Sequence, residues 1–194
     1  MSLAGLIVGL VIFLGAHSVR IFAEPWRTRQ IARLGQQRWK GLYSLVSLAG
    51  FALIVWGYGV SRADPVNLWD PPAWTRHAAA LLTIITFVLW TAAYVPGNRI
   101  KAALGHPMIL GVKVWALAHL ISNGGLADVV LFGAFLVWAV LDFRAARQRD
   151  RAAGTRYPSG SVGRDLSTLV IGLIAWWAFA QYLHGWLIGV RPFG

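Results

Sequence analysis

Six long runs of apolar residues follow one another along the chain, and short polar connections separate them. A helix needs about 20 residues to cross the hydrocarbon core of a bilayer, and most of these runs have roughly that length. The third run stops at Pro96 and Gly97, while Asn123-Gly124-Gly125 turns the short fourth run directly into the fifth. This turn predicts a tight antiparallel helical hairpin. The six runs are Leu3–Phe22, Trp39–Val60, Thr75–Val95, Pro107–Ser122, Leu126–Phe143 and Leu166–Val190.

The composition also indicates a membrane-embedded chain. Of the 194 residues, 57% are hydrophobic and only 13% are charged, whereas about 25% are charged in an average soluble domain. We therefore predict an all-α fold, a bundle of six transmembrane helices that forms a single domain over residues 1–194. The chain contains no cysteine, which excludes disulfides and thiolate metal ligands.

The net charge of +11 is interpreted as a topology signal. On a soluble protein it would suggest nucleic acid, but here Lys and Arg lie in short connections, so we expect no nucleic-acid partner. Cytoplasmic loops carry an excess of these residues, and the connections 23–40, 97–106 and 144–165 hold most of them. The pattern predicts a multi-pass protein of the bacterial inner membrane with both termini on the non-cytoplasmic side.

The predicted position in the membrane identifies some of the binding partners of the chain but not all of them. The basic connection 144–165 is expected to be solvated and to touch anionic membrane lipid. Whether the chain forms a homo-oligomer or binds a membrane partner is left open by the sequence.

Ionisable side chains inside a membrane span are costly and are candidates for function. His17 and His119 lie on different predicted helices, and two such histidines could bind the iron of a haem. The alternative is that each histidine bonds to a neighbouring helix. Arg20 follows His17 on the same helical stripe, and Trp115 lies one turn before His119, where it could pack against a flat ligand or simply against another helix.

Two further ionisable side chains lie just before and within the fourth run. His106 precedes Pro107 and is expected at the start of a helix, where an interfacial role and a functional one are equally consistent with the sequence. Lys113 could extend its amine to the cytoplasmic surface or pair with an anionic group such as a haem propionate.

The segment from Leu104 to Leu120 resembles the NnrU family of integral membrane proteins. The resemblance rests on Gly105-His106-Pro107, on Lys113-Val114-Trp115 and on Ala118-His119-Leu120. The continuation through residues 123–143 and the sequence Gly15-Ala16-His17-Ser18 also fit this family, and the similarity extends over the whole chain.

The family name comes from bacterial denitrification, and plant and cyanobacterial relatives include 15-cis-ζ-carotene isomerase, a membrane enzyme that uses haem b. The resemblance implies that His17 and His119 ligate haem b, whereas His106 matches the family pattern and is the less favoured candidate for the metal. Our leading hypothesis adds Arg20 or Lys113 near the propionates and Trp115 near the cofactor.

The implied function is a haem b-binding protein, either an isomerase of carotenoid-like polyenes or a non-enzymatic haem, electron-transfer or accessory protein of nitrite and nitric oxide reduction. The isomerase branch has a cysteine three residues before its second histidine, and Ala116 stands there in this chain. A mechanism through a thiolate ligand is therefore excluded.

Overall fold

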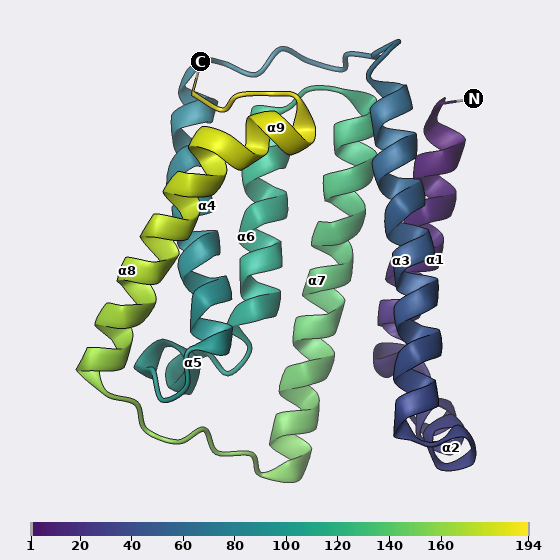
Figure 1. Cartoon of the computed structure of the whole chain (residues 1–194), viewed down its shortest axis with the longest axis vertical. Helices are drawn as coiled ribbons and strands as arrows, with labels where there is room; N and C mark the ends of the chain where they lie inside the picture. Colours follow the sequence, from purple (N-terminus) through teal and green to yellow (C-terminus); the bar gives the residue numbers. More distant parts are fainter. Residues whose placement is uncertain (1, 194) are drawn as a thin grey trace. The chain divides into compact units, whose positions relative to one another are not determined.

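The computed structural model describes residues 2–193, and helices make up most of them (Figure 1). The prediction of an all-α fold is confirmed. Among the described residues the only extended pairing outside the helices is an isolated bridge between Asn67 and Gly125. The helices are α1 (Ser2–Phe22), α2 (Glu24–Leu34), α3 (Gln36–Ser61), α4 (Trp74–Tyr94), α5 (Arg99–Leu104), α6 (Pro107–Ser122), α7 (Leu126–Ala153), α8 (Val162–Ala178), the π-helical η1 (Phe179–Leu183) and α9 (His184–Ile188).

Several of these helices are long and apolar enough to span a membrane. Within residues 2–193 there are five, formed by α1, α3, α4, α7 and the continuous stretch from α8 to α9. The chain is therefore a polytopic helical membrane protein. With 16 residues, α6 is apolar but shorter than a typical span, so the sixth crossing and the orientation of the termini stay predictions.

Two compact units make up the chain, and the boundary between them falls within α7. The first unit combines Met1–Asp70 with Asn123–Asp142, and the second combines Pro71–Ser122 with Phe143–Gly194. The prediction of a single domain stays a prediction.

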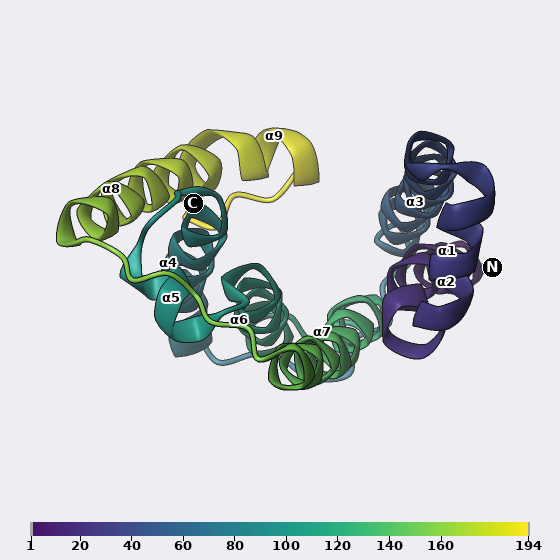
Figure 2. The ribbon, with the colours of Figure 1, turned by 90° about the horizontal axis from the view of Figure 1, so that it is seen from below.

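The first unit depends on a close approach between α1 and α3, which lie side by side when seen end on (Figure 2). Glycines make this approach possible. A Cβ atom on Gly9 would stand 2.6 Å from the backbone nitrogen of Ile54, and one on Gly50 would stand 2.7 Å from that of Phe13. A Cβ on Gly57 would overlap the backbone of Leu6. Small residues allow two helices in a membrane to bring their backbones together in this way.

The same unit is closed by contacts between the connection after α3 and the start of α7. Leu126 donates its backbone N–H to the carbonyl of Val66 at 2.8 Å, and Leu68 donates to the carbonyl of Gly124 at 2.8 Å. The Tyr58 hydroxyl on α3 donates to the Asp128 carboxylate in the first turn of α7. These bonds fix the turn Asn123-Gly124-Gly125 to the end of α3 and to the connection that follows it, while the antiparallel pairing of α6 with α7 stays a prediction.

In the second unit α4 packs against both α6 and α8. Gly111 of α6 leaves room for the Trp90 ring, since a Cβ there would stand 2.5 Å from the indole. On the other side of α4, Thr83 accepts a hydrogen bond of 3.0 Å from the indole N–H of Trp176.

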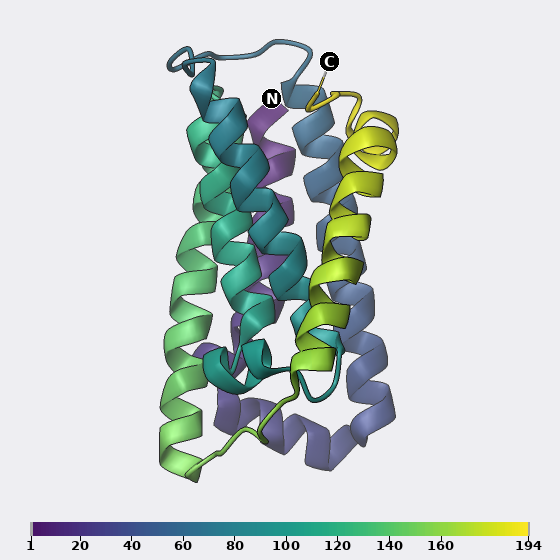
Figure 3. The ribbon, with the colours of Figure 1, turned by 90° about the vertical axis from the view of Figure 1, so that its left-hand side faces the viewer.

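The connections contain more structure than the hydrophobic pattern predicts. The basic segments 23–40 and 97–106 contain α2 and α5, and α7 continues past Phe143 to Ala153. Alanine, arginine and glutamine between 144 and 153 favour helix, so the polar sequence extends the helix that the apolar run begins. The connection from α7 to α8 then passes close to α5, where Ser161 donates its N–H to the Gly97 carbonyl at 2.9 Å (Figure 3).

We predict that Gly57→Ala destabilises the protein by about 1–3 kcal/mol, because the new methyl group meets backbone atoms of α1 that cannot move aside. The measurement is the thermal unfolding midpoint of the purified protein in detergent. Gly59→Ala is the matched control, since nothing lies within 4 Å of a Cβ at that position of the same helix. The control should be neutral or slightly stabilising; equal losses in the two variants would refute the close contact.

Candidate functional site

His17 lies in the second half of α1 with its imidazole held by its own helix. Its Nδ1 is 2.7 Å from the carbonyl oxygen of Phe13, one turn earlier. A carbonyl oxygen only accepts hydrogen bonds, so Nδ1 must carry the proton that is donated. In the neutral imidazole the lone pair then lies on Nε2, which is the form that binds a metal ion.

Aromatic side chains from the first unit surround this imidazole. The Phe13 ring is stacked on it with a centroid separation of 4.2 Å, Tyr43 of α3 lies at 5.3 Å, and Trp138 of α7 meets it edge-on at 6.0 Å. His17 therefore lies in flat, apolar surroundings that suit a planar hydrophobic ligand.

Besides Glu24 Oε2, two buried polar atoms of the same unit lack a hydrogen-bond partner among the described residues. They are the indole Nε1 of Trp138 and the hydroxyl of Ser47, which lies one turn after Tyr43 on α3. Leaving a buried donor unpaired costs about 1–3 kcal/mol, and such groups are rare in native proteins. An acceptor supplied by a bound ligand would remove this cost for Trp138.

His119 repeats the arrangement of His17 in the second unit. It lies on α6, and its Nδ1 is 2.9 Å from the carbonyl oxygen of Trp115. The same reasoning places the proton on Nδ1 and the lone pair on Nε2. The ring of Trp115 lies 5.2 Å from the imidazole, so the sequence-predicted Trp115 does accompany His119.

His17 and His119 lie in different units, and each offers one Nε2 lone pair within its own unit. Among the described residues no group of three or more His, Cys, Asp or Glu could hold a metal. A porphyrin supplies four nitrogens itself and asks the protein only for axial ligands. An imidazole whose other nitrogen donates to a carbonyl is suited to be such a ligand.

The two cations predicted near the propionates have partners within their own units. The Arg20 guanidinium lies 4.0 Å from the Glu24 carboxylate, and its side chain is 59% exposed. The amine of Lys113 lies 3.9 Å from the centroid of the Phe143 ring. Arg20 therefore places a positive charge near His17 in the sequence, and Lys113 places one near His119.

His106 differs from the other two candidates because it bonds to a carboxylate. Its Nε2 is 2.8 Å from Asp150 Oδ2, and the Tyr157 hydroxyl donates to the same oxygen at 2.8 Å. Because the carboxylate accepts, Nε2 donates and does not offer a lone pair to a metal. His106 thus joins the start of α6 to the end of α7 and to the following connection.

Sequence reasoning missed Asp150 and Tyr157, which are 44 and 51 residues from His106. Burial, the hydrogen bond to Asp150 and the charge of that carboxylate together raise the pKa of the Tyr157 phenol. The phenol is therefore a neutral donor at physiological pH, and the connection 154–161 is anchored by it rather than freely solvated.

The number of long apolar helices defines the class of this chain as a polytopic helical membrane protein. The family model described as NnrU protein matches residues 5–192, so this chain belongs to the NnrU family. No curated protein and no solved structure matches it.

We predict that Asp150→Asn lowers the thermal unfolding midpoint by several degrees, because the amide offers a weaker acceptor to His106 and Tyr157. Asp64→Asn is the control, since Asp64 is exposed in the connection after α3. Equal midpoints for Asp150→Asn and the parent protein would show that this carboxylate does not anchor the connection.

Proposed function

We propose that this NnrU-family protein binds haem b and that His17 and His119 are the axial ligands of its iron. The observation that carries the proposal is the shared bonding of the two imidazoles, in which Nδ1 donates to the carbonyl four residues earlier. This bond fixes the tautomer and orients the ring of a metal-binding histidine. The unpaired indole N–H of Trp138 beside His17 supports a ligand on that side.

The protein's part in this function is to hold two neutral imidazoles and to exclude water with Phe13, Tyr43 and Trp138. Arg20 and Lys113 supply positive charge for the propionates. When bound, haem would supply an iron centre for electron transfer or for activation of a π-system. The bacterial inner membrane is the proposed location, consistent with the basic cytoplasmic connections.

For the reaction, the family resemblance favours cis–trans isomerisation of a carotenoid-like polyene. Haem held by His17 and His119 would supply an iron that activates the π-system of such a substrate, provided that one of the two histidines is displaceable. The chain has no cysteine to offer a thiolate in place of that histidine. The second candidate is a non-enzymatic haem, electron-transfer or accessory protein of nitrite and nitric oxide reduction, for which two permanent histidine ligands are sufficient.

We predict that the protein purified after haem-supplemented expression contains haem b, and that His17→Ala and His119→Ala each lose most of it. The measurement is the pyridine haemochrome spectrum with reduced-minus-oxidised difference spectra. His77→Ala and His184→Ala are controls that remove histidines outside the proposed pair. His106→Ala should keep the haem, since its Nε2 is bonded to Asp150. A parent protein without iron or Soret absorption would contradict the proposal.

The two candidate functions differ in how the reduced protein should respond to carbon monoxide. We expect an isomerase to bind carbon monoxide, because one ligand is displaceable, and to convert a mixture of cis polyenes under reducing conditions. A low-spin reduced spectrum that ignores carbon monoxide, together with no conversion, would favour the electron-transfer or accessory function.

A further inference from the structure

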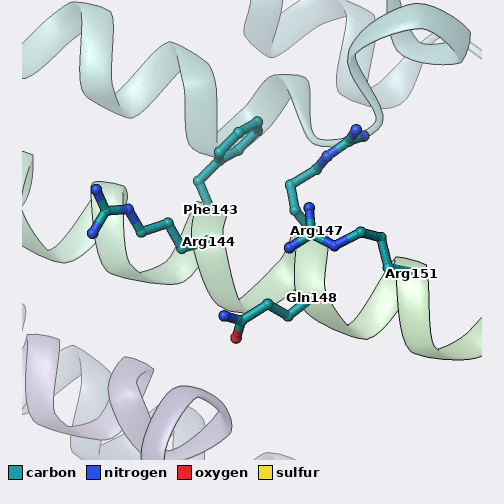
Figure 4. A pocket seen from close by; sticks show the side chains of 5 residues that line it. All are labelled: Phe143, Arg144, Arg147, Gln148 and Arg151. Atoms are coloured by element: carbon teal, nitrogen blue, oxygen red, sulfur yellow. The ribbon is translucent and has the colours of Figure 1, made fainter.

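The end of α7 carries a positively charged pocket that the proposed haem site does not use. It has a volume of about 290 Å³. We call it the arginine pocket, and its lining residues all come from the part of α7 that belongs to the second unit (Figure 4). They are Phe143, Arg144, Arg147, Gln148 and Arg151.

Among residues 2–193, none of the direct ion pairs involves a guanidinium of the arginine pocket; their cations include Arg20, Arg27, Arg99 and His106. Arg147 and the Asp150 carboxylate interact only as neighbouring charges. Two carboxylates flank the pocket along α7: Asp142, which precedes Phe143, and Asp150, which accepts from His106 and Tyr157.

Three like charges around one pocket repel each other unless an anion joins them. The C-terminal end of α7 contributes about half an elementary negative charge, and Asp142 and Asp150 offset a further part, so a net positive charge remains at the pocket. Guanidinium groups present paired N–H donors in a planar fork that matches the oxygens of a phosphate group. The arginine pocket therefore fits a phosphate better than a single carboxylate.

The position of the pocket along α7 indicates the source of that phosphate. Exposed Val137 and Leu141 precede Arg144 by seven and three residues, so they lie on the same side of this helix. An acyl chain beside them would bring its headgroup to the arginines. The predicted topology puts this end of α7 at the cytoplasmic leaflet, where anionic lipids gather. We propose that the arginine pocket binds the phosphate of an anionic phospholipid.

The test is a titration of the purified full-length protein with phosphatidylglycerol or phosphatidylcholine, followed by native mass spectrometry. The parent protein should bind one phosphatidylglycerol more tightly than further copies and more tightly than phosphatidylcholine. The triple variant Arg144→Gln, Arg147→Gln and Arg151→Gln should weaken that binding by about tenfold or more, since each cation near the surface adds to the attraction.

A matched control removes the same charge elsewhere. Arg29, Arg33 and Arg38 lie in the first basic connection and are exposed; changing all three to glutamine should leave the tight lipid bound. Equal losses in both triple variants would mean diffuse attraction and would overturn the proposal. The single variant Arg144→Gln, at an exposed position, gives a smaller loss of affinity and covers the case in which the triple variant fails to fold.

Two further readouts separate the lipid from other anions. Displacement of phosphatidylglycerol by millimolar inorganic phosphate would identify a site for a free phosphate and would overturn the lipid assignment. The haem content of the triple variant should equal that of the parent protein. Loss of haem with lipid binding intact would assign the arginines to the propionates instead. Because the lipid assay needs no haem, it can succeed whether or not the proposed haem function holds.

Discussion

Inside an apolar layer each polar group must find its partner nearby, and this constraint governs the structure from the backbone to the candidate ligands. Backbone amides meet it by forming helices. Polar side chains on those helices meet it by donating to a carbonyl one turn earlier, as the buried Thr86 and Thr168 do at 3.1 and 2.8 Å. His17 and His119 follow the same rule. The bond that makes each histidine tolerable in the layer also leaves its Nε2 as the metal-binding nitrogen.

Buried polar groups that have no hydrogen-bond partner are exceptions to this constraint, and they indicate where a ligand could bind. The indole of Trp176 reaches Thr83, whereas the buried indoles of Trp90 and Trp138 have no partner among the described residues. An unpaired buried donor is costly, so its persistence beside a proposed ligand histidine is consistent with a group that binds there. Trp138 meets that description, because its ring lies against His17.

The charged residues at the end of α7 and around α5 fall into two groups with different roles. Asp150 joins His106 and Tyr157, and the Arg99 side chain pairs with Asp165 at 2.6 Å, so these groups anchor the connections around α5 and α6. The arginines of the arginine pocket form no direct ion pair with these carboxylates, although Arg147 acts on Asp150 and Tyr157 as a neighbouring charge. Basic residues that serve only as a topology signal would not need to divide into cations with a direct ion pair and cations, grouped on α7, without one.

The sequence by itself determined the helical class, the positions of the apolar helices and the family, because these depend on the length and composition of continuous segments. It located α6 at Pro107–Ser122 with the bounds that the structure has, and it singled out His17 and His119. Only the tertiary structure decided that His106 bonds to Asp150 and Tyr157, and that Gly9, Gly50 and Gly57 lie where α1 crosses α3. The physical reason is that these partners are tens of residues apart, and which groups meet depends on how the helices pack rather than on any local spacing.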